Sequence, residues 1–513
     1  DLTVWYRGAP ARSGFGNVFA FTSKSGQPLL WTLSEPTGAR MWWPCKDHPE
    51  DKADSVSVRV TVPTGMRTTG NGALVESSDD GVHAVTRWVE RHPISTYLVA
   101  LASHPYVHLA DWYVTATGDS MPVGFWLFAS DTADAAPVIA KVPGAIAAYA
   151  ARFGPYPFLD EKYGEVEFGW GGGMENQTIT SLGSASSEYL MVHELAHQWW
   201  GDWVTCRDFR HLWLNEGFAT YGEALWAEAQ SGSDGYHAEM AASKYFGSGT
   251  IIVPDGANIS RMFSGSLTYN KASWVPHMLR HVMGDTLFFQ ALREYGRRHA
   301  GGNATTEDLR AVCEEYCGRD LGAFFAEWIY GEYYPDYGYR WSSAPAGNGW
   351  DVSLLLVQAQ TWQTFWMPVD VVVRTSGGDR TFVAWDSLPS QTFVFHVTEE
   401  PESVRIDPDE WILRTAGVLD VNDPAFPVAV RLQAPRPNPA PGSVTLDFVL
   451  PETAEAVLTV YDVRGARVRR LAGGTCSPGT HRIVWDGVDE RGRRAGPGVY
   501  LVRLEALGRS RTQ

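Results

Sequence analysis

The order of polar and apolar positions divides the chain into a β-rich start, a helical middle and a β-rich end. Polar and apolar side chains alternate in residues 55–62, which is the period of a half-buried strand. Turn-forming clusters at 69–72 and 78–81 separate this stretch from its neighbours. The pattern therefore predicts an N-terminal β-domain over residues 1–129.

Helical spacing dominates the next part of the chain, which is expected to form one domain over residues 130–335. The alanine-rich stretch from Ala135 to Phe153 is predicted to be one helix that ends at Gly154-Pro155. Further helices are predicted at 188–201, 216–230 and 270–283, with several short ones from 285 to 330.

Alternating strand patterns return afterwards, for example in residues 350–357 and 369–373. Residues 427–441 are rich in proline and are predicted to be a linker, after which short strands and turns alternate to the end. The expected fold is therefore multidomain α+β, with a β-sandwich domain over 336–425 and a second small β-sandwich over 426–513.

A chain of 513 residues is too long for one hydrophobic core, so several domains are expected. A hydrophobic content of 44% is ordinary for a soluble globular protein. The formal net charge of −17 argues against nucleic acid as a partner, because no basic surface is offered to phosphates. No apolar run is long enough to span a membrane, and no signal peptide precedes Asp1-Leu2-Thr3-Val4. Five scattered cysteines do not indicate a disulfide framework.

One short segment carries the residues of a catalytic metal site. His193 and His197 are four residues apart, so on a helix they project from one face and can hold one ion. Glu194 lies beside them, where it can take a proton from metal-bound water. Glu216 follows eighteen residues after His197. It is predicted to start a second helix, Asn215 to Ala229, and to be the third ligand of one Zn²⁺.

Two other features are weaker. Glu223 is seven residues after Glu216 and shares its helical face, so it is either a hydrogen-bond partner of a ligand or an ordinary solvent-facing carboxylate. A second histidine pair, His277 and His281, has the same spacing but lacks the adjacent Glu, and it is interpreted as packing.

At this point the sequence resembles the M1 family of gluzincin aminopeptidases. The matching segments occur in the family's order: 35–40 with 43–47, then 172–176, 193–201 with 212–219, and 269–272 with 278–279. The resemblance runs from residue 1 to about 335. It implies that residues 130–335 form a thermolysin-like α/β catalytic domain and that the chain is an aminopeptidase.

The segment Gly172-Gly173-Met174-Glu175-Asn176 looks like the exopeptidase motif of that family. Carboxylates placed together recognise a free α-ammonium by charge-assisted hydrogen bonds, and they disfavour chains whose amino terminus is blocked or internal. Glu175 is the main candidate, and Glu35 from the first domain is the second. The whole segment is expected to bind substrate, its glycines permitting close backbone approach.

The resemblance also implies that Tyr269 is catalytic and donates its phenolic hydrogen to the oxyanion, while Glu194 moves the proton from water to the leaving amine. The sequence departs from the family at Leu33, where a Gln is common, which changes the lining of the first side-chain pocket. Residues 2–8 look like a middle strand of the family's first domain, so earlier strands are expected to be missing.

The C-terminal segment resembles the FlgD-type immunoglobulin-like domains of secreted bacterial proteins, in its strands at 443–451, 460–465, 484–487 and 496–504. This resemblance implies a secreted or cell-surface bacterial protein, with export machinery or cell-surface attachment as the partner of the domain. An inert β-sandwich spacer is the alternative.

The leading hypothesis is a secreted zinc aminopeptidase that acts on peptides with a free amino terminus. One alternative is a thermolysin-like endopeptidase, which shares the metal helix but lacks the amine-binding carboxylates. Another is a non-catalytic secreted binding protein on a peptidase scaffold, which the retained Glu194 and Tyr269 argue against.

Overall fold

The structure is a computed structural model, and it describes residues 2–8, 10, 18–419, 431–440, 442–450, 454–476, 479–507 and 509–513. The chain forms two compact units, Asp1–Tyr333 and Tyr334–Gln513. The expected multidomain α+β architecture is confirmed for the chain as a whole, with helices confined to the first unit among the described residues.

The first unit begins with two antiparallel sheets of order β1-β2-β7-β4 and β3-β6-β5. Their strands are β1 (Phe19–Lys24), β2 (Gln27–Thr32), β3 (Val56–Pro63), β4 (Arg67–Gly70), β5 (Ala73–Asp79), β6 (His83–Glu90) and β7 (Leu101–His104). Residues 2–8 form no strand, contrary to the prediction, because no described strand pairs with them. Short 3₁₀ turns occur at Ala39–Met41, Thr96–Leu98 and Phe209–His211.

A mixed five-stranded sheet of order β11-β12-β10-β9-β8 follows. It contains β8 (Val107–Val114), β9 (Ser120–Leu127), β10 (Tyr163–Glu167), β11 (Gly173–Met174) and β12 (Thr180–Leu182), while β13 (Thr205–Cys206) and β14 (Asn303–Ala304) pair separately. The β8–β9 hairpin joins this sheet through the parallel pairing of β9 with β10, although its residues lie within the range predicted for the first domain.

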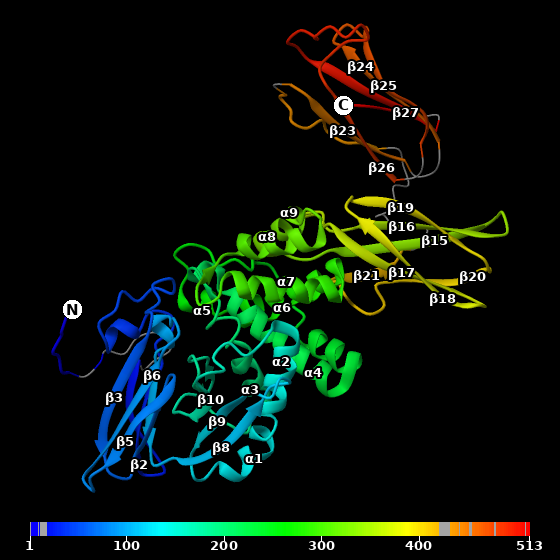
Figure 1. Cartoon of the computed structure of the whole chain (residues 1–513). Helices are drawn as coiled ribbons and strands as arrows, with labels where there is room; N and C mark the ends of the chain where they lie inside the picture. The colour runs from blue at the N-terminus through cyan, green and yellow to red at the C-terminus, as the bar shows by residue number, and fades with distance from the viewer. Residues whose placement is uncertain are drawn as a thin grey trace. The chain divides into compact units, whose positions relative to one another are not determined.

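Helices cover this sheet, with α2 against β8 and α3 against β12 (Figure 1). They are α1 (Thr132–Ile139), α2 (Val142–Phe153), α3 (Glu188–Ala196), α4 (Trp213–Ala242), α5 (Ile259–Met262), α6 (Ala272–Met283), α7 (Asp285–Arg298), α8 (Thr306–Cys317) and α9 (Gly322–Phe325). Two π-helical segments, η4 (Gly265–Lys271) and η5 (Ala326–Tyr330), complete the set.

Two predicted helices differ from the observed ones. The stretch from Ala135 to Phe153 is two helices, because Pro143 has no N–H to continue the first one and instead occupies the first turn of α2. The helix expected at 188–201 ends at Ala196. The end of α2 at Gly154, which has φ 104°, is as predicted.

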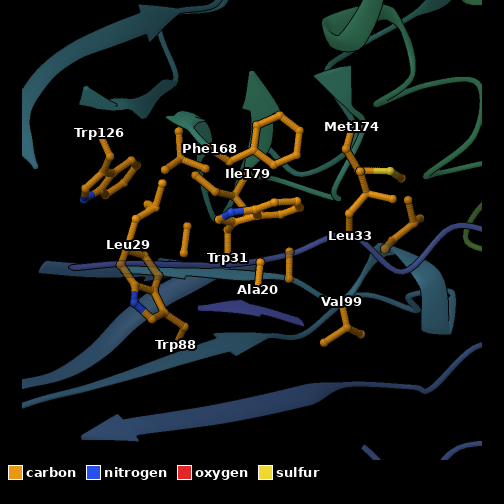
Figure 2. Close-up of a cluster of buried hydrophobic side chains, with 14 of the residues drawn as sticks. Ala20, Leu29, Trp31, Leu33, Trp88, Val99, Trp126, Phe168, Met174 and Ile179 are labelled. Atoms are coloured by element: carbon orange, nitrogen blue, oxygen red, sulfur yellow. The ribbon is translucent and has the colours of Figure 1, made fainter. Parts of the chain in front are cut away.

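One hydrophobic core joins the N-terminal sheets to the mixed sheet (Figure 2). Trp88 and Trp126 lie at one end of the labelled cluster, and Leu33 and Met174 lie at the other. Since all four side chains are at most 7% exposed, the first domain is held against the second by apolar burial.

The second unit contains two pairs of sheets, as the strand patterns predicted. The first pair has the orders β19-β16-β15-β21 and β18-β17-β20. Its strands are β15 (Asp336–Ala346), β16 (Gly349–Gln358), β17 (Met367–Thr375), β18 (Gly378–Asp386), β19 (Ser390–Val397), β20 (Pro401–Ile406) and β21 (Thr415–Val418).

The second pair has the orders β22-β23-β26 and β25-β24-β27-β28, around a core of its own. Its strands are β22 (Arg431–Leu432), β23 (Val444–Leu450), β24 (Ala454–Asp462), β25 (Arg467–Cys476), β26 (Gly479–Trp485), β27 (Tyr500–Ala506) and β28 (Arg509–Thr512). None of the described helices is long and apolar enough to cross a membrane, and the five cysteines are free thiols.

The close packing of α3 against α4 requires a glycine, because there is no room for a side chain at position 222. A Cβ atom on Gly222 of α4 would lie 2.7 Å from Cβ of Ala196 and 3.2 Å from the hydroxyl oxygen of Tyr149. Gly222→Ala is therefore expected to destabilise the first unit by about 1–3 kcal/mol, since the two helices must move apart. The measurement is the thermal unfolding midpoint of the transition that involves α3 and α4.

Gly144→Ala in α2 is the matched control. Its added Cβ atom would meet only Trp226, at 3.9 Å. Alanine is favoured over glycine in a helix by about 0.5–1 kcal/mol, so this variant should unfold at the same or a slightly higher temperature. Equal effects of the two substitutions would contradict the proposed close contact.

Candidate active site

Local contacts set the position of α3, which carries His193 and Glu194. The side chain of Ser187 caps the helix by accepting a hydrogen bond from the amide of Leu190 at 3.3 Å. The helix ends before His197, but this residue keeps helical angles, φ −59° and ψ −24°. The four-residue spacing therefore still places both imidazoles on one face, as predicted from the sequence.

Three ligand atoms converge at the predicted metal site. Nε2 of His193 lies 3.3 Å from Nε2 of His197 and 3.4 Å from Oε2 of Glu216, and the third side of this triangle is 3.3 Å. Ligands about 2.0–2.1 Å from a tetrahedral zinc ion lie about 3.3–3.4 Å from one another. The spacing of the three atoms thus fits zinc without any rearrangement.

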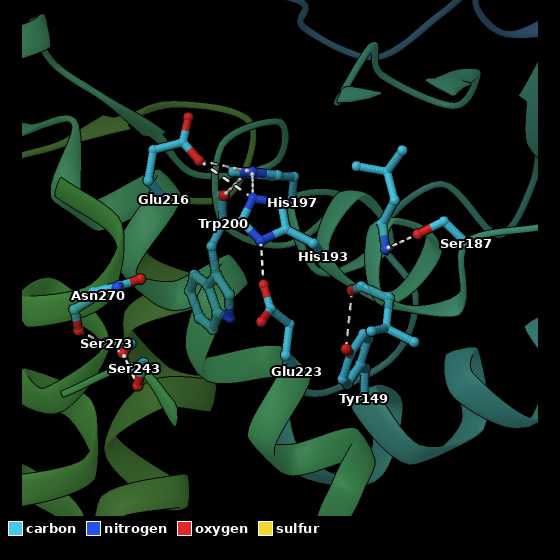
Figure 3. Close-up of polar contacts among 12 residues, drawn as sticks. Tyr149, Ser187, His193, His197, Trp200, Glu216, Glu223, Ser243, Asn270 and Ser273 are labelled. Carbon is cyan, nitrogen blue, oxygen red and sulfur yellow. Dashed lines mark hydrogen bonds and ion pairs between the residues drawn. The ribbon is translucent and has the colours of Figure 1, made fainter. Parts of the chain in front are cut away.

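The other ring nitrogens fix the tautomers of the two histidines (Figure 3). Nδ1 of His197 donates to the carbonyl oxygen of Trp200 at 3.0 Å, and Nδ1 of His193 donates to Oε1 of Glu223 at 2.6 Å. In the neutral rings both Nε2 atoms then present lone pairs toward each other and toward the Glu216 carboxylate. Such an arrangement needs positive charge between the three atoms, which protons on the histidines supply in the absence of a metal ion and which a bound metal ion would supply in their place.

The position of Glu216 depends on the tight packing of α4. In addition to Gly222 against Ala196, a Cβ atom on Gly217 would lie 2.7 Å from Cβ of Ala272. Burial would raise the pKa of Glu216, but the two histidines outweigh it and hold that pKa at about 2. Glu216 therefore stays ionised, which is the form that binds a metal.

Glu194 is buried between the metal ligands and the exopeptidase segment. Burial, opposed by the two histidines, raises the pKa of its carboxyl group to about 8. A Cβ atom on Gly173 would lie 2.1 Å from Oε1 of Glu194, so only glycine at this place allows the carboxylate its position. The sequence interpretation had assigned the glycines to substrate pairing, and it did not anticipate this contact.

Glu35 and Glu175 lie together beside the metal ligands. An oxygen of each lies within 4.8 Å of the other and of a Glu216 oxygen, and the two residues are 4% and 3% exposed. Oε1 of each has no hydrogen-bond partner among the described residues. Burial, together with the charge of Glu175, raises the pKa of Glu35 well above its ordinary value. The two Oε1 atoms are therefore hydrogen-bond acceptors for which no donor is found among the described residues.

The rest of the exopeptidase segment divides into two groups. Gly173, Met174 and Glu175 line a cavity of about 200 Å³ that also contains the three metal ligands. Gly172 is not among the lining residues. Asn176 is also absent from the lining, and it instead links two parts of the fold. It donates to the carbonyl oxygen of Leu98 at 3.3 Å and accepts from the hydroxyl of Ser181 at 2.9 Å.

Tyr269 lies in the π-helical segment η4 and lines the same cavity. Its ring stacks on the imidazole of His193, with ring centroids 5.9 Å apart and an interplanar angle of 20°. Tyr189 also stacks on His193, at 6.4 Å and 23°, and it shares a hydrogen bond with Glu223. No motif in the sequence pointed to Tyr189. Of the two alternatives left open for Glu223, the structure favours the hydrogen-bond partner of a ligand over the solvent-facing carboxylate.

A mixed sheet, a helix with two candidate histidine ligands and a glutamate, and a third candidate ligand from the next helix form an arrangement typical of metallopeptidases. Comparison with known proteins gives the family. Residues 174–328 match the model of the peptidase family M1 domain, and residues 1–98 match the peptidase M1 N-terminal domain. The chain thus contains both M1 domains, and the resemblance inferred from the sequence is confirmed.

Curated relatives agree over the same region. Aminopeptidase M1 of Arabidopsis thaliana is 29% identical over 334 residues, which are 59% of this chain and 37% of that protein. Aminopeptidase N of Streptomyces lividans is 30% identical over 335 residues, 59% of this chain and 38% of that protein. The chain therefore spans well under half the length of either relative.

Solved structures support the cofactor and the fold. An M1 zinc metallopeptidase from Deinococcus radiodurans is 28% identical, with a TM-score of 0.54 over 62% of this chain and 73% of that one. Legionella pneumophila aminopeptidase A shares the fold, with a TM-score of 0.68 at 18% identity over 78% of this chain and 48% of that one. The first of these proteins is by name a zinc enzyme, and the ligand triad of this chain has the spacing that suits the same ion, whereas the second match shows the fold alone.

The FlgD resemblance is also confirmed, since residues 440–510 match the model of the FlgD Ig-like domain. This match covers the described strands β23 to β27.

Glu223 provides a test of the metal site. Glu223→Ala removes the acceptor that orients His193, so zinc affinity is expected to fall roughly 10- to 100-fold. Glu223→Gln keeps an acceptor oxygen at this place and should lose less. Zinc affinity measured by competition with a chromogenic chelator gives both values. An unchanged affinity in Glu223→Ala would show that the contact does not support the ligand.

Proposed function

We propose that this protein is a zinc-dependent aminopeptidase, which releases single amino-terminal residues from peptides. The observation that carries the proposal is the pair of buried carboxylates, Glu35 and Glu175, whose Oε1 atoms lack partners beside the metal ligands. Buried charges are stable only when they are paired, so a cationic group of the substrate is the missing partner.

The α-ammonium group of a peptide has the required charge and three donor hydrogens. Its capture by Glu35 and Glu175 would place the first peptide bond of the substrate next to the three metal ligands, within a cavity of about 200 Å³. An internal segment or an acetylated terminus brings no positive charge, and binding it would leave both carboxylates without a partner. This argument favours an exopeptidase over a thermolysin-like endopeptidase.

Glu194 is proposed as the general base. The chemistry expected from a bound zinc ion is polarisation of the scissile carbonyl group and acidification of the attacking water. Glu194 lies beside the ligands in the same cavity, and the lack of a side chain at Gly173 leaves room for its carboxylate there. It would accept the proton of the water and deliver it to the leaving amine.

Tyr269 is proposed to stabilise the oxyanion. An ordinary tyrosine is protonated at neutral pH, so its hydroxyl can donate a hydrogen bond. The stacked position on His193 holds the ring at the edge of the cavity. The π-helical backbone of η4 turns this residue toward the ligands, as π-bulges often do at functional sites.

Apolar side chains surround the two amine-binding carboxylates. Leu33 is two residues before Glu35, Met174 is next to Glu175, and Trp170 and Phe263 also line the cavity. The described lining contains no lysine or arginine to pair with a negatively charged first side chain, so neutral first residues are the proposed substrates.

The C-terminal match supports a role outside catalysis. We propose four domains, 1–106, 107–335, 336–425 and 426–513. These are the boundaries predicted from the sequence, except that the β8–β9 hairpin belongs to the second domain because β9 pairs with β10. The FlgD Ig-like match at 440–510 supports a secreted or surface-attached bacterial protein, with export machinery or the cell surface as partner of that domain.

The central experiment compares leucine p-nitroanilide with its N-acetylated form, with and without a zinc chelator. Hydrolysis of the free amine alone, and its loss with chelator and recovery with added zinc, are the expected results. Equal hydrolysis of both compounds would favour the endopeptidase. No hydrolysis of either, by a protein shown to contain zinc, would favour a non-catalytic binding protein.

Variants of the two carboxylates test recognition of the amine. Glu175→Gln and Glu35→Gln each leave the ammonium with one charged partner fewer, so kcat/KM for the free amine should fall by roughly 30-fold or more. Glu165→Gln is the control, because Glu165 is also fully buried but lies on β10 outside the cavity. Zinc content should be unchanged in all three. A normal kcat/KM in both Glu175→Gln and Glu35→Gln would contradict the proposed recognition of the amine.

A further inference from the structure

A second cavity, of about 770 Å³, lies between the sheet β3-β6-β5 and the β8–β9 hairpin, and it shares no residue with the zinc site. Both domains of the first unit contribute to its walls. Small side chains face the space from both sides, Ala73 and Ala84 from one and Ala110 and Gly124 from the other. The volume lies within the usual range for small-molecule sites and exceeds that of any single side chain.

Aromatic rings form the inner wall of this cavity. Trp88 and Trp126 meet edge to face, with ring centroids 5.8 Å apart, and they project from opposite sides of the domain junction (Figure 2). The ring of His108 stacks on Trp126 at 4.6 Å. Together these rings offer flat and edge-on surfaces suited to an aromatic molecule.

Two glycines make room for the Trp126 ring. Gly124 and Gly164 are register partners on the neighbouring strands β9 and β10. A Cβ atom on Gly124 would lie 2.8 Å from the Trp126 ring, and one on Gly164 would lie 2.9 Å from it. The indole ring of Trp126 therefore packs directly on the backbone of β9 and β10. The two glycines of the sheet determine where this aromatic ring lies.

Charged groups of both signs line the cavity, namely Arg67, Lys162, Asp79 and Glu161, and the ammonium group of Lys162 already donates to the carbonyl oxygen of Thr178. The guanidinium of Arg67 forms no ion pair with a carboxylate in the part of the chain that the structure describes. Asp79 accepts hydrogen bonds from the Thr64 hydroxyl and the Gly81 amide. Oε1 of Glu161 accepts from the Arg91 amide at 2.8 Å and lies 3.6 Å from the Arg91 guanidinium, whereas its Oε2 is buried without a hydrogen-bond partner among the described residues.

One hydroxyl group among the residues that line the cavity also has no hydrogen-bond partner among the described residues. It is that of Thr86, whose Oγ1 is buried at the cavity. Thr86 is two residues before Trp88 and so lies on the same face of β6. A buried hydroxyl without a partner is uncommon in folded proteins, and a ligand oxygen would satisfy it.

We propose that this cavity is a binding site for a small aromatic carboxylate. The aromatic ring would pack against Trp88 and Trp126, and the carboxylate would pair with Arg67. A guanidinium binds a carboxylate through two parallel hydrogen bonds, which selects this anion over a neutral or cationic group. The site is independent of the proposed peptidase activity, because none of these residues lines the zinc cavity.

The test is isothermal titration calorimetry of the full chain with 3-phenylpropionate and, as the charge-reversed probe, phenethylamine. Saturable binding of the carboxylate and at least tenfold weaker binding of the amine are expected. The titration is repeated on protein stripped of zinc, because a carboxylate can also bind the metal. Binding in the second cavity should survive the removal of zinc.

Two variants locate the site. Arg67→Gln should weaken the carboxylate roughly tenfold, since a charge-assisted pair is lost. Ala110→Phe should abolish binding by filling the space, while Ala110→Ser should retain it. Arg87→Gln is the control for charge, because Arg87 lies on β6 outside the cavity and bonds to Ser57. Thermal midpoints confirm that each variant is folded.

Three outcomes would overturn the proposal. They are no heat of binding up to roughly 10 mM probe, equal affinity for the two probes, and unchanged affinity in folded Arg67→Gln. Binding that disappears with zinc would assign the carboxylate to the metal centre, and it would also overturn the proposal while leaving the peptidase activity untouched.

Discussion

Electrostatic repulsion inside the site is the constraint on which the rest of the first unit depends. Four carboxylates, those of Glu35, Glu175, Glu194 and Glu216, are each at most 5% exposed and belong to one cluster. Charges so close together in a dry environment strongly oppose one another, and they are stable only with compensating cations. A zinc ion satisfies one side of the cluster, and the ammonium group of a substrate would satisfy the other. The scaffold therefore has to hold these groups against their mutual repulsion, which the packing of α3 on α4 and the shared apolar core both do.

The features that could be predicted from the sequence are those set by local spacing. The positions of His193 and His197 follow from the pitch of a helix, and the carboxylate of Glu216 follows from the next helix along the chain. The helices expected between 285 and 330 include α8, which Thr305 caps through a reciprocal pair of hydrogen bonds with Asp308. The strands of both sandwiches in the second unit were likewise visible in the alternation of side chains.

The features that could not be predicted depend on contacts between distant segments. Alternation identifies β8 and β9 as strands, but it does not say which sheet they join. The role of Gly173 depends on the Glu194 side chain, which reaches it from another element. Asn176 belongs to the exopeptidase segment and yet holds the carbonyl of Leu98 in the other domain. For the same reason the second cavity could not be foreseen, because its walls come from two domains.

The origin of Glu35 has a consequence for how such a protein can change. This carboxylate comes from the first domain, whereas Glu194 and the metal ligands come from the second. In the proposed mechanism, part of the amine recognition thus comes from the first domain, whereas Glu175 and the hydrolytic residues come from the second, and the apolar core around Leu33 and Met174 joins the two. Substitutions in that core could shift the position of Glu35 and alter which termini are accepted, while the hydrolytic residues stay in place. The preference for particular amino termini could therefore change during evolution while the hydrolytic residues are retained.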